Sequence, residues 1–195
     1  MFHSYLLILL LLSSFAIGQE SKIEWSPNYQ IQIDDFKPSR VDINQSITAI
    51  SVSSGVMVDF AVQMSNIEFM FTKNFNAKLE CSFNKESASI TAPDSLKAGK
   101  LLKLVQFDFD LSELYTRKMR KELFENKKMF SNVTFFQPYF DKMNAARNKI
   151  SSEIYTASNF GENSTFLEKE HAAIKEEINL LSDFCKECKP PKKRK

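Results

Sequence analysis

Apolar and polar residues alternate through much of the segment from residue 23 to residue 92. In the stretch YQIQIDDF the alternation places Tyr29, Ile31 and Ile33 on one face, and the same pattern recurs in SITAISVSSGVMVDFAVQ and IEFMFTKNFNAKLECSF. A period of two residues is typical of half-buried β-strands, and Ser54-Gly55 predicts a bend between two of them. We therefore expect this β-rich segment to form an antiparallel sheet.

After residue 94 the period changes to that of helices, and charges of both signs separate the apolar positions. A central helix stripe begins at Phe136, with Pro138 suited to its first turn. Thr165 and Glu168 have the spacing of a capping box before the last helix. The predicted apolar stripes are Phe136, Phe140, Met143, Ile150 and Ile154, and then Leu167, His171, Ile174, Ile178 and Leu181. Strands followed by helices predict an α+β fold, with the N-terminal antiparallel sheet packed against three C-terminal helices over residues 95–184.

The stretch LLKLVQFDFDLSELYTRKMRK, residues 101–121, fits both periods. Its central eight residues alternate strictly, as in a strand, but the long run of good helix formers without Gly or Pro favours a helix over residues 97–127. On that helix we expect Asp108 and Asp110 on a solvated face, together with a Glu113–Arg117 pair of about 0.3–0.5 kcal/mol. The alternative is that Asp108 is a metal ligand or a buried acid.

The first 18 residues resemble a secretory signal peptide. An apolar run precedes Ala16-Ile17-Gly18 and is too short to span a bilayer. We expect cleavage near Gly18, a secreted or periplasmic protein, and a single α+β domain over residues 19–184. No later segment has the length and hydropathy of a transmembrane helix. The mature chain then keeps one histidine, His171, which excludes any mechanism that needs two from one subunit.

Charge is distributed unevenly along the chain. The net charge is +2, but the last eleven residues, CKECKPPKKRK, contain six basic residues and one acidic residue. We expect residues 185–195 to be a solvated basic tail. The alternative is electrostatic attachment of this tail to an envelope protein or an anionic polymer. Nucleic acid is not an expected partner for a secreted chain.

Three cysteines remain to be assigned. The CxxC pair, Cys185 and Cys188, follows the end of a predicted helix, whereas redox pairs use the dipole at a helix N-terminus. A structural zinc site would have to recruit Cys81 and His171 as its remaining ligands. We expect a plain disulfide or free thiols rather than a redox or zinc centre.

The segment VQFDFDLSELYTRKMRK resembles the core of a family of secreted bacterial proteins of unknown function that are predicted to be zinc-dependent proteases. That family has the pattern Leu-x-His-Glu-Gln-x-His-Phe-Asp-(Ile/Leu)-x-Glu-Leu-Tyr-x-Arg-Lys-(Leu/Met)-Arg-Lys. Trp25, Asp35-Phe36 and Ser54-Gly55 are similar to landmarks of its N-terminal half. The matching positions of the core are Gln106, Phe109, Asp110, Glu113, Leu114, Tyr115, Arg117, Lys118, Met119, Arg120 and Lys121. The resemblance implies a zincin-like fold.

The same resemblance shows which catalytic groups are missing. In an HExxH helix the two histidines bind zinc and the glutamate activates the metal-bound water. Here Leu104 and Asp108 stand at the histidine positions, and Val105 stands at the glutamate position. Leucine cannot bind zinc and valine cannot accept a proton. A second family segment falls on Tyr155–Gly161, again without a histidine, and His171 is expected to be a partly buried histidine rather than a ligand.

Three functions are consistent with these residues. The first is a secreted, non-catalytic member of the protease-like family that acts by binding or as a structural envelope protein, without a cofactor. The second is a divergent metal-dependent hydrolase built from carboxylates such as Asp108, Asp110 and Glu113. The third is an adaptor that attaches to anionic surfaces through its basic tail.

Overall fold

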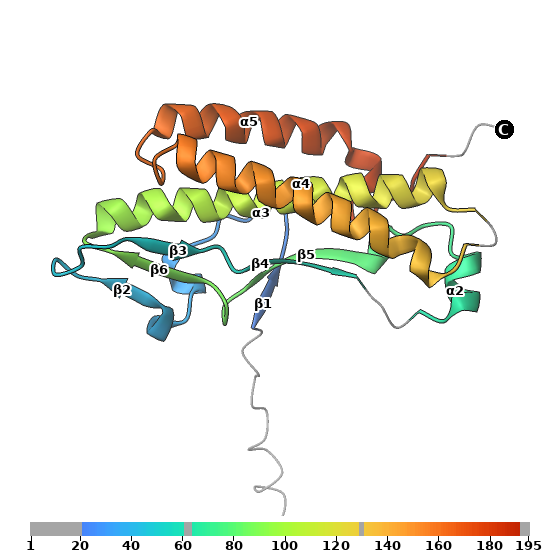
Figure 1. The fold of residues 1–195 in the computed structure, drawn as a ribbon, viewed down its shortest axis with the longest axis horizontal. Coiled ribbons are helices and arrows are strands. Elements are labelled where there is room, and N and C mark those ends of the chain that lie inside the picture. The colour runs from blue at the N-terminus through green and yellow to red at the C-terminus, as the bar shows by residue number, and fades with distance from the viewer. Residues whose placement is uncertain (1–20, 61–63, 129–130, 192–195) are drawn as a thin grey trace, which may run out of the picture.

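The structure, a computed structural model, describes residues 21–60, 64–128 and 131–191. Its strands form the lowest layer in Figure 1, the long helix α3 (Ser95–Asn126) lies on them, and helices α4 (Phe136–Ala157) and α5 (Ser164–Leu180) cover α3. This arrangement is an α+β fold, as predicted. The predicted signal peptide, residues 1–18, lies outside the described residues.

The described strands belong to two three-stranded sheets rather than to one antiparallel sheet. One sheet has the order β1-β5-β4 and is antiparallel throughout. The other has the order β2-β6-β3, and its β2–β6 pair is parallel. The strands are β1 (Lys22–Glu24), β2 (Val41–Ile43), β3 (Ser51–Ser53), β4 (Val56–Phe60), β5 (Leu79–Asn84) and β6 (Ser89–Ala92). The prediction of a wholly antiparallel sheet is therefore wrong for β2.

The chain passes from one sheet to the other at Gly55, between β3 and β4. Gly55 has a φ of +63°, which L side chains rarely adopt. A Cβ atom there would lie 2.6 Å from Ala88 Cβ and 2.7 Å from the Asn84 carbonyl oxygen. The predicted bend at Ser54-Gly55 is confirmed, and it requires glycine because of both the backbone angle and the lack of space.

Two of the predicted strands are absent. The segment around Ile67 forms the short helix α2 (Asn66–Phe71), because the Ser65 hydroxyl accepts a hydrogen bond from Glu68 N and caps the first turn. The segment around Ile31 is irregular and ends in a 3-10 turn, Ile33–Asp35. There the Asp35 carboxylate accepts hydrogen bonds from the Tyr29 hydroxyl and from Gln32 N, both at 2.7 Å. Side-chain caps thus determine both segments in place of the alternating pattern.

The predicted helices are present with small shifts. The ambiguous stretch is helical throughout, because α3 contains residues 101–121, and Asp94 caps its start by accepting from Lys97 N at 2.7 Å. Pro138 lies in the first turn of α4, as expected. The predicted capping box at Thr165 is wrong, since the N-cap of α5 is Asn163, two residues earlier, and its side chain accepts from Phe166 N at 3.1 Å.

The interior contains two apolar clusters, and α3 contributes to both. The larger core lies where the middle of α3 meets the strands and α5, and includes Phe83, Ile90 and Leu104. The smaller core lies at the C-terminal end of α3, and includes Phe69, Leu123 and Phe136. Among the described residues, no helix is long and apolar enough to cross a membrane.

Candidate functional site

The positions that the resemblance aligns with a zinc motif, Leu104, Val105 and Asp108, lie in the middle of α3. Leu104 and Val105 are completely buried in the larger core. Asp108, one turn after Leu104, has only 3% of its surface exposed. The expectation of a solvated face is therefore wrong for Asp108, and the alternative of a buried acid is the one that the structure supports.

Three side chains of α4 bind the Asp108 carboxylate. The Ser151 hydroxyl donates a hydrogen bond to one oxygen at 2.7 Å, and the Tyr155 hydroxyl donates to the other at 3.0 Å. Arg147 Nη2 lies 3.6 Å from the second oxygen, while Arg147 Nε donates to Ser112 Oγ at 3.0 Å. Burial, together with the charge of Asp108, raises the pKa of Tyr155, so this hydroxyl stays protonated and remains a donor.

Asp110 binds different parts of the fold from Asp108, namely the N-terminal segment and α5. Trp25 Nε1 donates to one of its oxygens at 2.7 Å, and His171 Nε2 lies 2.6 Å from the other. Gln106 Nε2 is 3.5 Å from both oxygens, and the side-chain oxygen Gln106 Oε1 accepts from Ile31 N at 2.8 Å. Asp110 therefore joins the N-terminal segment and α5 to α3, and the predicted solvated position of this residue is also wrong.

A cavity of about 390 Å³ adjoins this contact, with Gln106 and His171 in its lining. The His171 side chain is 17% exposed, and its ring packs against the edge of Phe107 with centroids 5.8 Å apart. His171 is thus a partly buried histidine with a partner, as predicted. The Nε2 atom of His171 is already in contact with the Asp110 carboxylate.

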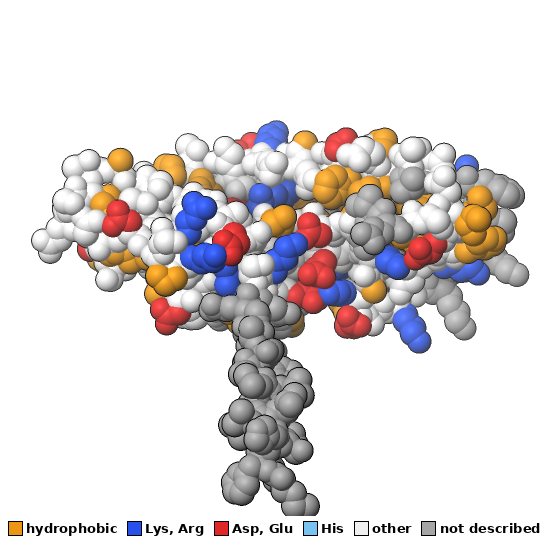
Figure 2. Space-filling view, turned by 90° about the horizontal axis from the view of Figure 1, so that it is seen from below, with side chains coloured by type: hydrophobic (Ala, Val, Ile, Leu, Met, Phe, Trp, Pro, Cys, Tyr) orange, Lys and Arg blue, Asp and Glu red, His pale blue; other side chains and the backbone are white. Residues whose placement is uncertain are grey.

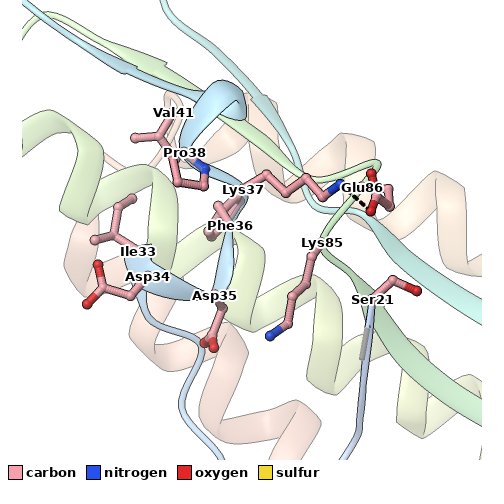
Figure 3. A pocket seen from close by; sticks show the side chains of 10 residues that line it. All are labelled: Ser21, Ile33, Asp34, Asp35, Phe36, Lys37, Pro38, Val41, Lys85 and Glu86. Carbon is pink, nitrogen blue, oxygen red and sulfur yellow. Dashed lines mark ion pairs between the residues drawn. The ribbon is translucent and has the colours of Figure 1, made fainter. Parts of the chain in front are cut away.

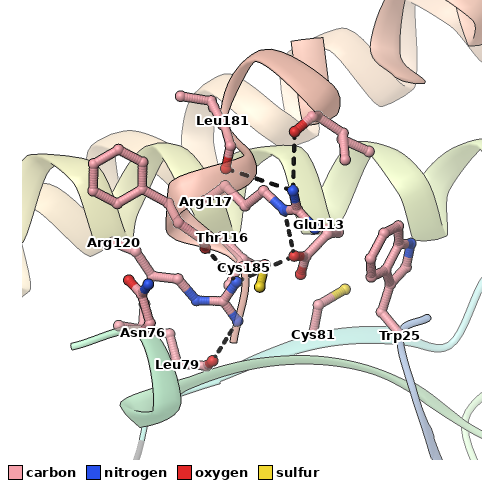
Figure 4. Close-up of polar contacts among 12 residues, drawn as sticks. Trp25, Asn76, Leu79, Cys81, Glu113, Thr116, Arg117, Arg120, Leu181 and Cys185 are labelled. Atoms are coloured by element: carbon pink, nitrogen blue, oxygen red, sulfur yellow. Dashed lines mark hydrogen bonds and ion pairs between the residues drawn. The ribbon is translucent and has the colours of Figure 1, made fainter. Parts of the chain in front are cut away.

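Glu113 forms the third buried acid of α3 (Figure 4). Its Oε1 accepts from Arg117 Nε at 2.8 Å and from Arg120 Nη1 at 3.1 Å. Arg117 also donates to the Ile178 carbonyl at 2.9 Å, and Arg120 donates to the Leu79 and Phe184 carbonyls at 2.7 and 2.9 Å. Burial lowers the pKa of Arg120, and the charge of Glu113 opposes that shift. The predicted exposed Glu113–Arg117 pair is in fact a buried network.

Cys81 lies beside this network and is not a reactive thiol. It is buried, and its Sγ donates to the Phe109 carbonyl at 3.7 Å. Burial, followed by the negative charge of Glu113, raises the pKa of the Cys81 thiol well above its usual value. Because the thiolate is the nucleophile and the metal ligand, Cys81 is unsuited to either role.

The other two cysteines form a disulfide that holds the beginning of the predicted tail. Cys185 is bonded to Cys188, in agreement with one of the two expected states. Lys186 pairs with Glu24 at 2.7 Å and with Glu80 at 2.9 Å, and Asn76 Nδ2 donates to the Cys188 carbonyl at 2.9 Å. The first residues of the tail are therefore held by the body of the protein rather than solvated. Residues 192–195 lie outside the described part of the chain.

A larger cavity, of about 640 Å³, lies between the 3-10 turns and the β5–β6 connection (Figure 3). Its lining mixes acidic and basic side chains, and Lys37 pairs with Glu86 across it. Asp35 is already bound by Tyr29, whose pKa burial and this hydrogen bond raise to about 12. The mixed charges favour no one class of ligand.

The donor set of α3 does not fit zinc. Tetrahedral zinc in proteins requires three or four His, Cys, Asp or Glu ligands that converge on one point. Within the described residues, no group of three or more such side chains converges in this way. Leu104 supplies no ligand atom, and Asp108 and Asp110 are bound by α4 and by α5 respectively.

Comparisons with protein-family models, with curated proteins and with solved structures find no match for this chain. The function must therefore be argued from the residues themselves. Sequence reasoning missed the partners of the buried acids, although one signal was present. Arg147, Ser151 and Tyr155 recur every four residues on α4 and form a polar stripe beside its apolar one.

Proposed function

We propose that this protein is a secreted, non-catalytic relative of the zinc-dependent proteases that it resembles, with a zincin-like scaffold, and that it acts by binding or as a structural element of the envelope. One observation carries the proposal. The three positions that would supply the ligands and base of an HExxH site are two core residues, Leu104 and Val105, and one carboxylate bound by three side chains of α4.

The buried acids of α3 support this proposal because each one joins a different part of the fold. Asp108 binds α4, Asp110 binds Trp25 and α5, and Glu113 binds two arginines that reach the end of α5 and the chain after it. A catalytic acid must be able to reach the reacting atoms, but these three residues are at most 4% exposed. Their role is to hold the helices and the strands together.

The carboxylate hydrolase has no comparable support. Such a site would need Asp108, Asp110 and Glu113 to approach one cation. Their hydrogen-bond and ion-pair partners lie on different elements, and the Glu113 carboxylate is already paired with two guanidinium groups. No specific contact among the described residues favours this second function.

Metal analysis, a peptidase assay and thermal unfolding of the purified protein test the proposal together. We expect no stoichiometric zinc, no hydrolysis of a denatured protein substrate, and the same unfolding temperature with and without a chelator. Zinc at about one ion per chain that resists dialysis, or peptidase activity that Asp108→Ala abolishes and Asp141→Ala retains, would overturn it. Asp141 is a suitable control because it is an exposed residue of α4.

Secretion is tested separately by fractionating cells and determining the N-terminus of the exported protein. We expect the chain to begin at Gln19, after cleavage at Gly18. Retention of the whole chain in the cytoplasm would contradict the secretion proposal without affecting the argument about the zinc site.

A further inference from the structure

Helix α2 exposes two large apolar side chains at one end of the molecule. Ile67 is 70% exposed and Phe71 is 69% exposed, and they lie four residues apart on the same face of the helix. On the opposite face Phe69 is completely buried and packs against Phe75 with ring centroids 5.1 Å apart. The buried Phe69 therefore anchors α2 and keeps Ile67 and Phe71 at the surface. Figure 2 shows hydrophobic side chains gathered at this end.

A groove of about 450 Å³ lies between α2 and the end of α3, and lysines surround it. Its lining includes Phe71, Lys73 and Lys128, with no acidic residue among the described side chains that form it. Lys73 and Lys128 are exposed. Lys127 supports the rim, because its Nζ donates to the Met70 carbonyl at 2.9 Å and lies 5.4 Å from the centre of the Phe69 ring. The groove thus combines apolar surface with positive charge.

The sequence that follows the last described residue of the groove is basic. Pro191 lines the groove, and the next four residues of the sequence are all basic: Lys192, Lys193, Arg194 and Lys195. The nearby acid Glu68 is paired with Lys78 at 3.1 Å, so its charge is partly compensated.

We propose that Ile67, Phe71, Lys73 and Lys128, together called the α2 face, dock on an anionic lipid bilayer. Stable attachment to a membrane surface takes two signals, an apolar group that enters the interface and basic residues that face anionic headgroups. The α2 face supplies both. Lysines are point charges on flexible stems and suit a diffuse layer of headgroups. This inference names a partner for the proposed binding role, and it rests on that role.

Co-sedimentation with lipid vesicles tests the α2 face directly. We expect the protein to sediment with vesicles of phosphatidylcholine and phosphatidylglycerol, to stay in solution with phosphatidylcholine alone, and to be released as salt is raised. The double variant Ile67→Ser/Phe71→Ser should reduce the bound fraction about tenfold or more. Its matched control is Leu96→Ser/Leu180→Ser, which removes two residues that are 73% and 78% exposed elsewhere. That control should bind as the parent protein does.

A third variant, which lacks residues 192–195, separates the tail from the groove. We expect weaker binding that the Ile67→Ser/Phe71→Ser change reduces further. If removal of the tail abolishes binding and the Ile67→Ser/Phe71→Ser variant binds normally, the α2 face is not the docking surface. Equal binding to both kinds of vesicle, or binding to neither, also overturns the inference. Zinc content and peptidase activity do not enter these measurements, so a failure of the α2 face is distinguishable from a failure of the non-catalytic role.

Discussion

Helices α3 and α5 are built from similar residues but stand in different surroundings. Every residue of α3 from Leu104 to Leu114 is buried, and eight of the helix's buried side chains are polar or charged. In α5 only Leu167, Ile174 and Ile178 are buried, and they form one stripe. The difference arises because α3 lies between the strands and a pair of helices, whereas one side of α5 faces solvent. Buried polar residues thus have a structural role in α3, whereas in α5 most polar residues face solvent and His171 is the one that contacts a buried acid of α3 among the described contacts.

The comparison is tested most strongly by removing one glutamate from each helix. Glu113→Ala leaves the buried guanidinium groups of Arg117 and Arg120 without their acid, and should lower the free energy of unfolding by about 3–5 kcal/mol. Glu177→Ala breaks an exposed pair with Lys118 and should cost about 0–1 kcal/mol. Urea unfolding measures both. Equal losses would show that the Glu113 network is not buried as described.

Asp108→Ala should have the next largest effect. It removes the acceptor of Ser151 and Tyr155 and leaves Arg147 with no acid, at a cost of about 2–3 kcal/mol. The matched change on α5 is Glu168→Ala, which breaks an exposed pair with Lys103 and should change stability by less than about 0.5 kcal/mol. A stable Asp108→Ala variant would contradict the structural role of this acid.

His171→Ala tests the contact between α5 and Asp110, one of the buried acids of α3. The variant loses the contact with Asp110, and we expect a loss of about 1–2 kcal/mol in unfolding free energy. Lys169→Ala, an exposed position on the same helix, should leave the unfolding midpoint nearly unchanged. If both variants unfold alike, His171 contributes nothing beyond its place on the helix.

The smallest expected effect is a pH dependence at Glu162, just before α5. Hydrogen bonds from Lys100 and Lys97 lower the pKa of Glu162 from 4.5 to about 2. A lowered folded-state pKa stabilises the protein above the unfolded pKa, and this contribution disappears as the pH falls from 4.5 to about 2. Glu162→Gln should remove that part of the acid dependence of the urea midpoint. Because the carboxylate is exposed, salt should weaken the effect, and Glu176→Gln should not reproduce it.

The sequence predicted those elements whose determinants are local. The apolar stripes of α4 and α5 and the bend at Gly55 are confirmed because each depends on a single face or a single backbone angle. The lack of a ligand atom at Leu104 was likewise readable from the sequence, since no neighbouring residue can give a leucine a ligand atom.

The rest depends on residues that are distant in the sequence. The partner of Asp110 is Trp25, 85 residues earlier, and that of Asp108 is Tyr155, 47 residues later. These contacts cannot be read from the sequence, and without them two aspartates on a helix are most simply interpreted as solvated. The strict alternation from residue 105 to 112 has the same origin, because a helix enclosed on all sides can bury polar and apolar residues in any order when each polar group finds a partner.

The length of α3 also has a consequence for how the molecule comes apart. At about 1.5 Å per residue the helix extends for roughly 48 Å, and it forms a wall of both the larger and the smaller core. Neither core can open without freeing part of the same helix, so the two behave as one cooperative unit. Amide hydrogens in the middle of α3 should then exchange with deuterium only through global unfolding.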